Sequence, residues 1–333
     1  MALRERRSGK GGGSLNARLA PARLHREIAV LKGADGDTPA ALTHMERSTA
    51  AIDALPPADR ASAEAQRTLS INLWSMSDFE VSRGDLTAAG ELRRRAVSIY
   101  ETMYQQSPDN ATRNRNLSIG YKGYGAVLHA QGQPQRAREL YEKAAALDEL
   151  RLKSDAVNPE WQLDLSYAIA SIASLDLGEG DAASALERYR KALALREAVM
   201  RADPNNVEAA RGAARAHRTI AQSLAAQNDL PGAFRHARET LTISDRLARG
   251  QPSNKLLAGD AAAARAFLLA VISRADGNTL SRRDLAAGWT AACKDSPSVS
   301  RWFEQQSVPL RNSLGLDTAI VTKALSRCAA NDR

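Results

Sequence analysis

The side chains that most often carry chemistry are few in this sequence and lie far apart. No Gly-x-Ser-x-Gly segment is present to hold a nucleophilic serine. The histidines form no His-Glu-x-x-His motif, and no two are four residues apart, the spacing by which one helix binds zinc. They are His25, His44, His129, His217 and His236. The sequence therefore predicts a protein that is not an enzyme, with no catalytic residue, no cofactor and no metal.

Two further features could suggest chemistry, and neither has the required spacing. Cys293 and Cys328 form no Cys-x-x-Cys pair and have no histidine cluster nearby, so we expect reduced thiols in a cytoplasmic protein rather than a zinc site. Residues 9–14 read Gly-Lys-Gly-Gly-Gly-Ser, which lacks the Gly-x-x-x-x-Gly-Lys-Ser/Thr spacing of a phosphate loop. We interpret this stretch as a flexible linker or the start of a truncated protein.

The elements that position the side chains follow a repeat. A turn position recurs about every 48 residues (84 − 36, for example), and such a period is typical of a repeat array. It is occupied by Gly36, Gly84, Gly132, Gly180 and Asn228. Small residues recur five positions after each turn, and larger apolar residues recur fifteen positions after it, as in Ala185 and Leu195. Alternating small and large positions at helical spacing predict antiparallel helix pairs that stack on the next pair.

Composition supports an all-α chain with three parts. Alanine, leucine, arginine and glutamate are strong helix formers. Residues 1–20 form a basic Gly/Arg-rich head that we expect to be disordered, because it has little apolar surface. Residues 21–275 contain roughly five helix pairs and one further helix. Residues 276–333 keep apolar residues at loosely helical spacing, and we expect them to form a helical segment that caps the array.

The unit around Gly180 resembles a tetratricopeptide repeat (TPR). It has small residues at the three places the motif requires, Ala173, Ala185 and Ala192, and the usual aromatic residue, Tyr189. The difference is length, about 48 residues instead of 34, which lengthens both helices. The resemblance covers about residues 22–275 and implies a right-handed α-solenoid of antiparallel helix pairs with a C-terminal helical cap.

The resemblance also implies a partner-binding groove lined by the first helix of each pair. Carrying the groove positions onto this chain gives Ile71, Trp74, Asp78, Ile119, Lys122, Tyr167, Arg215 and Arg218. The cationic members favour an acidic or carboxylate-terminated partner. Two alternatives stay open. Trp74 and Tyr167 either line the groove or belong to the core, and Arg215 and Arg218 either bind the partner or are solvated surface.

The sequence of the repeats is similar to that of long repeats in bacterial multidomain proteins. Many of these are serine/threonine kinases with the repeats C-terminal to the kinase domain. The similarity is clearest in 158–166 (Asn-Pro-Glu-Trp-Gln-Leu-Asp-Leu-Ser) and 189–192 (Tyr-Arg-Lys-Ala). We therefore expect a non-enzymatic scaffold or adaptor for a protein or peptide partner, in bacterial signalling. The alternative is a detached regulatory region of such a kinase, although no kinase motif is present.

The formal charge of +8 and the pI of 9.7 leave a basic nucleic-acid-binding repeat protein as a less favoured alternative. Lysines and arginines are spread among glutamates, and the dense basic run is confined to Arg4, Arg6, Arg7 and Lys10. This pattern indicates a solvated surface. No apolar stretch approaches the roughly 20 residues that span a bilayer, so we expect no membrane span.

Overall fold

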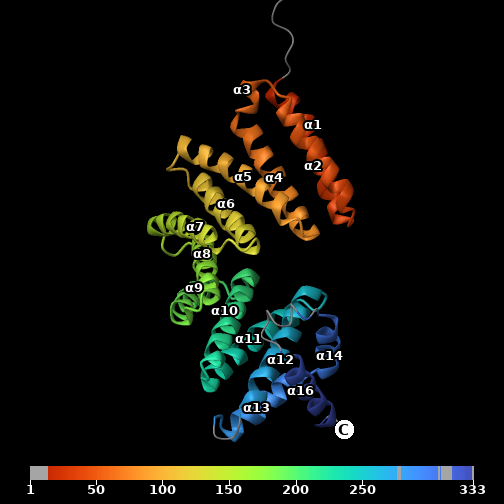
Figure 1. Ribbon diagram of the computed structural model, residues 1–333, viewed down its shortest axis with the longest axis vertical. Coiled ribbons are helices and arrows are strands. Elements are labelled where there is room, and N and C mark those ends of the chain that lie inside the picture. Colours follow the sequence, from red (N-terminus) through yellow and green to blue (C-terminus); the bar gives the residue numbers. More distant parts are fainter. Residues whose placement is uncertain (1–13, 276–278, 307, 309–316, 332–333) are drawn as a thin grey trace, which may run out of the picture. The chain divides into compact units, whose positions relative to one another are not determined.

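The computed structural model describes residues 14–275, 279–306, 308 and 317–331 (Figure 1). Every regular element in this part of the chain is an α-helix, which confirms the predicted fold class. The contacts divide the chain into two compact units, residues 1–151 and 152–333, and each is described by itself. The helices are α1 (Leu15–Ala34), α2 (Thr38–Asp53), α3 (Pro57–Arg60), α4 (Ala63–Arg83), α5 (Leu86–Gln106), α6 (Ala111–Ala130), α7 (Pro134–Ser154), α8 (Pro159–Gly178), α9 (Ala182–Ala202), α10 (Val207–Ala226), α11 (Leu230–Gly250), α12 (Lys255–Arg274), α13 (Arg282–Cys293), α14 (Ser296–Gln305) and α16 (Thr318–Asn331).

Consecutive helices pack against each other within each unit (Figure 1). In the first unit α1 packs on α2 and α4 on α5, and α6 follows on α5. In the second unit α8 packs on α9 and α10 on α11, and α12 continues the series on α11. The boundary between the units falls in the last turn of α7. The prediction of stacked helix pairs is confirmed.

The turn inside each helix pair has the same backbone geometry. All five turn residues have positive φ, a conformation that glycine adopts freely and asparagine more readily than most residues. The values are 81° at Gly36, 83° at Gly84, 74° at Gly132, 87° at Gly180 and 62° at Asn228. The backbone therefore requires glycine or asparagine at this position, which explains the period found in the sequence.

Polar caps define the helix starts on both sides of these turns. The aspartate after the turn accepts a hydrogen bond from the backbone N–H three residues on, as Asp181 does from Ser184 N at 3.0 Å. The recurring asparagines cap the first helix of each pair, as Asn206 does from Ala209 N at 2.9 Å. These bonds satisfy N–H groups that lack a partner within the helix.

The small-residue positions lie where two helices touch. Five positions after the turn, the alanines of all repeats are fully buried: Ala41, Ala89, Ala137, Ala185 and Ala233. The close approach lets a hydroxyl on one helix reach the backbone of its partner. Ser48 Oγ donates to the Ala22 carbonyl at 2.6 Å, and Thr240 Oγ1 donates to the Ala214 carbonyl at 3.3 Å. These positions therefore tolerate only small side chains.

The first helix begins earlier than the sequence predicted. α1 starts at Leu15, and the Ser14 side chain accepts from Ala17 N as its N-cap. Residues 15–20 are helical because Leu19 is fully buried in a cluster with Ile52, Leu55 and other apolar residues of the first unit. The expected disordered head of residues 1–20 thus overlaps α1. Residues 1–13 of that head lie outside the described residues.

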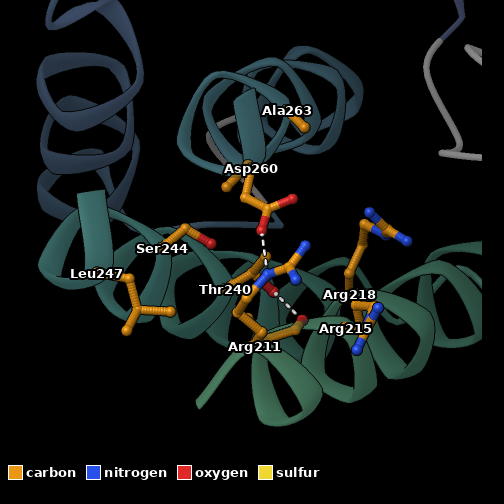
Figure 2. Close-up of a pocket in the computed structure, with 10 residues that line it drawn as sticks. Arg211, Arg215, Arg218, Thr240, Ser244, Leu247, Asp260 and Ala263 are labelled. Atoms are coloured by element: carbon orange, nitrogen blue, oxygen red, sulfur yellow. Dashed lines mark hydrogen bonds and ion pairs between the residues drawn. The ribbon is translucent and has the colours of Figure 1, made fainter. Parts of the chain in front are cut away.

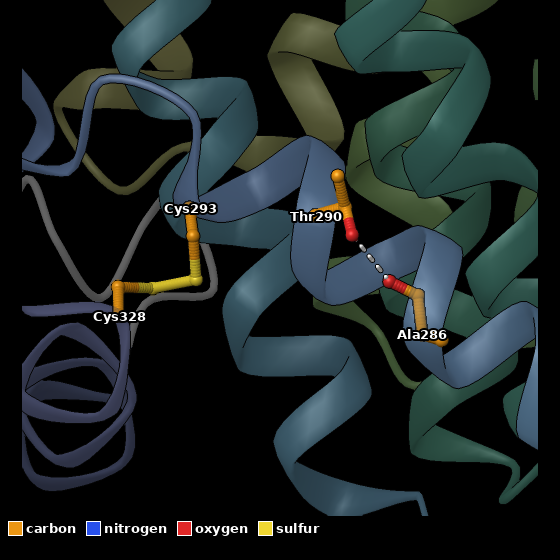
Figure 3. Close-up of a disulfide and its surroundings, with 4 residues drawn as sticks. All are labelled: Ala286, Thr290, Cys293 and Cys328. Carbon is orange, nitrogen blue, oxygen red and sulfur yellow. Dashed lines mark hydrogen bonds between the residues drawn. A yellow bond between two sulfur atoms is a disulfide. The ribbon is translucent and has the colours of Figure 1, made fainter. Parts of the chain in front are cut away.

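The C-terminal helices α13, α14 and α16 all pack against α12. Cys293 of α13 and Cys328 of α16 form a disulfide with Cα atoms 5.2 Å apart (Figure 3). The prediction of reduced thiols is therefore wrong. The two cysteines are 35 residues apart in sequence, and they come together because their helices pack on the same neighbour. Sequence spacing carries no sign of that contact.

Among the described helices, α12 alone is long and apolar enough to cross a membrane by length and composition. The relevant stretch is an 18-residue window within Lys255–Arg274. Two-thirds (67%) of that window is buried within the protein, including Leu268, Leu269 and Ile272. The helix is therefore the core helix of the second unit, and its apolar residues pack between α11 and the C-terminal helices.

Candidate functional site

A small pocket lies between α10, α11 and α12 in the second unit (Figure 2). Its volume is about 40 Å³. Arg211, Arg215 and Arg218 of α10 line it together, because residues three and four apart lie side by side on a helix. The other lining residues are Ala214, Thr240, Ser244, Leu247, Asp260, Ala263 and Ala264. We call this site the arginine pocket. It contains both arginines predicted for the groove.

Only part of the positive charge in the arginine pocket is balanced by the described residues. Arg211 Nε donates to Asp260 Oδ2 of α12 at 2.7 Å (Figure 2). Arg215 is exposed and Arg218 half-buried, and neither forms an ion pair with the described residues. Arg218 Nε is buried without a hydrogen-bond partner. Burial lowers the pKa of Arg218, and the neighbouring charge of Arg215 lowers it further.

Tyr167 of α8 is held by two contacts in the same unit. Its hydroxyl donates to Glu208 Oε1 at 3.1 Å, and the Arg196 guanidinium lies 5.1 Å from its ring centroid. Burial raises the pKa of Tyr167, and the Glu208 charge raises it further. The ring is half-buried. Its contacts therefore fit the core alternative as well as the groove alternative.

Arg196 of α9 is a buried cation whose hydrogen-bond partners are neutral. Its Nε donates to Ser166 Oγ at 3.0 Å and its Nη1 to the Gly212 carbonyl at 2.9 Å. A Cβ at position 212 would lie 3.0 Å from Arg196 Cδ, so the glycine makes room for this side chain. Burial lowers the pKa of Arg196 to about 10, and the charge of Arg215 contributes to the shift.

In the first unit, Trp74 of α4 packs rather than standing free. The Arg93 guanidinium of α5 lies 3.3 Å from its ring centroid, a cation–π contact. On α6, a Cβ at Gly123 would lie only 2.2 Å from Trp74 Cη2, so the ring rests against that glycine. Asp78 forms an ion pair with Arg93 at 2.5 Å while its side chain stays 60% exposed. Trp74, Arg93 and Asp78 therefore form one stacked group.

Lys122 of α6 is engaged in a buried ion pair. Its Nζ lies 3.0 Å from Asp148 Oδ2 of α7, and the Asp148 carboxylate is fully buried. Asp148 also accepts from the Ser118 hydroxyl and from Arg151. Lys122 therefore stabilises the α6–α7 pair. The remaining predicted groove residues of this unit, Ile71 and Ile119, are half-buried on α4 and α6.

Four of the five histidines form two equivalent pairs. His25 and His44 Nδ1 atoms lie 3.0 Å apart between α1 and α2, and His217 and His236 Nδ1 atoms lie 2.8 Å apart between α10 and α11. His217 is buried in the core of the second unit. Among the described residues, no group of three or more His, Cys, Asp or Glu side chains could hold a metal ion.

Four residues of these sites were not anticipated: Arg93, Asp148, Arg196 and Asp260. Arg211 and Asp260 are 49 residues apart, about one repeat, so opposite charges one period apart were an available signal. The structure brings Arg215 and Arg218 together in one pocket. Trp74 and Asp78 meet in another group, in the first unit. A continuous groove through all eight predicted residues stays a prediction.

Comparison by sequence places this chain in no known group: no protein-family model matches it, and no curated protein matches it. Solved structures do match. The apo form of RapI is 10% identical, with 93% of this chain and 99% of RapI covered and a TM-score of 0.57. The S. pombe nuclear import adaptor Nro1 is 14% identical, with 91% and 99% covered and a TM-score of 0.56.

One further match has TPR-like repeats. A kinesin light chain protein of Podosopora anserina with TPR-like repeats is 17% identical, with 69% of this chain and 98% of that chain covered and a TM-score of 0.49. At such identities a likeness shows the fold alone. The fold is one of stacked antiparallel helix pairs, which RapI and Nro1 share, and it agrees with the TPR-like resemblance seen in the sequence. The link to kinase-associated repeats stays a prediction.

Proposed function

We propose that this protein is a non-enzymatic scaffold that binds a protein or peptide partner, with the arginine pocket as its anchor in the second unit. The observation that carries the proposal is the pair Arg215 and Arg218, two neighbouring guanidiniums that form no ion pair with the described residues. Arginine is a residue type that often dominates binding energy at interfaces. The Asp260 carboxylate, which could otherwise act as a base, is held by Arg211.

The fold supports this proposal. TPR-like helix pairs place many side chains along extended faces, and an extended face suits a peptide better than a small substrate. The similar structure of Nro1 belongs to a nuclear import adaptor. We take that role as compatible with the proposal, since the likeness itself concerns the fold.

The experiment is a display selection of peptides against the purified protein. Selected peptides are then tested by hydrogen exchange, and we expect slower exchange in α10 and α12, the helices that carry Arg215, Arg218 and Asp260. A set of peptides that binds nowhere, or that protects no part of either unit, would contradict the scaffold proposal. Unrelated binders that protect the same helices would support it.

Nucleic-acid binding is the alternative class that charge alone would permit. In the described part of the chain many basic side chains are already paired with acids, such as Arg93 with Asp78 and Arg265 with Asp245. Such pairing leaves less charge to replace counterions along a phosphate backbone. DNA binding at low salt that weakens steeply as salt increases would favour this alternative over a peptide scaffold.

We further propose bacterial signalling as the setting, including a detached regulatory region of a kinase. The support is the sequence similarity of the repeats to kinase-associated repeats. A kinase reading frame directly upstream in the genome would strengthen this proposal. Cytoplasmic location stays a prediction. The Cys293–Cys328 disulfide favours an oxidising compartment instead, because disulfides are rare in the cytosol. Thiol titration of protein purified under alkylating conditions decides between the two.

A further inference from the structure

The charges around the arginine pocket do not balance among the described residues. Asp260 neutralises Arg211 at 2.7 Å, whereas Arg215 and Arg218 share the pocket without an ion pair. Behind α10, the buried Arg196 adds a further positive charge whose hydrogen-bond partners are neutral. Glu208, an acidic residue at the start of α10, already accepts from Tyr167. The four arginines named here therefore outnumber the two carboxylates, Asp260 and Glu208, and both carboxylates are already engaged.

The pocket also contains donors that have no acceptor. Arg218 Nε is buried without a hydrogen-bond partner, and the Ser244 hydroxyl, which lines the same pocket, forms no hydrogen bond with the described residues. A buried donor without a partner costs free energy, and the cost is greater for a charged group. An anion in the pocket would offer acceptors to both donors. The isolated protein therefore leaves donors in this pocket without an acceptor.

The size of the pocket limits what can enter. The pocket is small, with a volume of about 40 Å³, and suits a group of a few heavy atoms. One side stays open, because Arg215 is exposed. A carboxylate fits these limits, and planar guanidiniums bind carboxylates by paired, charge-assisted hydrogen bonds. Free phosphate is also an oxyanion. Unlike a side-chain carboxylate, it is not attached to a peptide that can extend through the open side of the pocket.

We propose that the arginine pocket binds the carboxylate of an acidic side chain from a partner peptide, held by Arg215 and Arg218 with Ser244 as a further donor. The proposal rests on the proposed scaffold function and specifies its partner. It predicts that peptides recognised by the second unit carry at least one aspartate or glutamate, and that their binding weakens as salt is added.

The probe is fluorescein-labelled hexaglutamate blocked at both ends, with hexaglutamine as the neutral control, measured by fluorescence anisotropy on the full chain. We expect hexaglutamate to bind the wild type and hexaglutamine not to bind. Arg215→Gln and Arg218→Gln should each weaken binding at least tenfold. Arg246→Gln is the matched control, because Arg246 is exposed on α11 and does not line the pocket. It should bind like the wild type.

Arg218→Lys tests the geometry. It keeps the charge and loses the planar fork, so we expect binding between that of the wild type and that of Arg218→Gln. Circular dichroism checks each fold. Arg215→Gln alters an exposed side chain and keeps the test decisive if Arg218→Gln fails to fold.

Four results would overturn the proposal. The first is equal hexaglutamate binding by the wild type and both glutamine variants. The second is equal binding of hexaglutamine. The third is a melting temperature raised by inorganic phosphate through Arg218 while hexaglutamate does not bind, which would identify a site for a free oxyanion. Display-selected peptides that protect α10 without any acidic residue would overturn this inference and leave the scaffold function standing.

Discussion

Asp148 offers a sharp test of how the first unit is held together. Its fully buried carboxylate is shared by the Ser118 hydroxyl, Lys122 and Arg151. The two cationic side chains are themselves only 14% and 3% exposed. Asp148→Ala removes the carboxylate and leaves both charges in a desolvated place. Removing one partner of a buried ion pair costs about 3–5 kcal/mol. We expect about 3 kcal/mol, because long cationic side chains can shift their charged ends toward water.

Two further variants separate the charge from the packing. Lys122→Met leaves Asp148 bonded to Ser118 and Arg151, so we expect a loss of about 2 kcal/mol, a usual net value for one hydrogen bond to a charged group. Replacing Asp148 by Leu together with Lys122 and Arg151 by Met removes all three charges. That triple variant should recover much of the lost stability, since apolar groups can replace a buried ionic cluster.

The assay is native-state hydrogen exchange of α6 and α7, because repeat arrays need not unfold as one cooperative unit. The control is Glu149→Ala, which removes a neighbouring carboxylate that is exposed. If Asp148→Ala alters the protection of α6 and α7 no more than Glu149→Ala does, the buried network is not what stabilises this helix pair. Lys122 would then return as a candidate groove residue.

Three other perturbations test separate features. Burial and the neighbouring His236 lower the pKa of His217 to about 4, so the folded protein keeps this ring neutral while the unfolded chain protonates near pH 6.5. Stability should therefore be complete above that pH and fall by about 3 kcal/mol as the pH drops to 4. Melting curves across this range check it, and a His217→Leu variant with the same pH dependence would refute it. Gly180→Ala forces alanine to a φ of 87° and should cost about 1 kcal/mol in thermal melting, whereas Gly178→Ala, at a helical position with open space, should not destabilise. A matching loss at both glycines would contradict the turn argument. Replacing Cys293 and Cys328 by serine opens a loop of 35 residues and should cost about 4 kcal/mol by chain entropy. Limited proteolysis should then cut near α13 and α16 while α8 to α11 persist, and unchanged cleavage would count against the bond.

The helix boundaries could be predicted because their causes are local. A positive-φ glycine and a capping asparagine affect only the few residues around them. The turn at Gly180 and the helix start at Asn206 can therefore be predicted without knowledge of the fold. The same holds for the fully buried alanines, whose spacing repeats with the turn. Leu19 shows where local signals end. The segment before it is polar and rich in glycine. The chain is nevertheless helical at Leu19, because this side chain packs in an apolar cluster with residues distant in sequence.

The site could be predicted only in part, because its chemistry depends on neighbouring helices. The positions of Arg215 and Arg218 follow from the repeat, and the pocket contains both. The repeat does not predict which residue neutralises each charge. Asp148 and Arg196 occupy the same place in successive repeats, yet one is an acid among cations and the other a cation among neutral groups. Each is explained by a residue on the facing helix, which a repeat pattern does not specify.

The repeating glycine turns have a consequence for protein engineering. A Cβ at Gly36, Gly84, Gly132 or Gly180 would meet nothing within 4 Å, so each turn stands clear of other residues. Cutting the chain at one turn and rejoining it at the next would delete about 48 residues and return every following helix to an equivalent neighbour. The array can accordingly be treated as interchangeable cassettes. Chimeras that carry the second unit's cassettes in a different number would show how far the binding surface can be shortened.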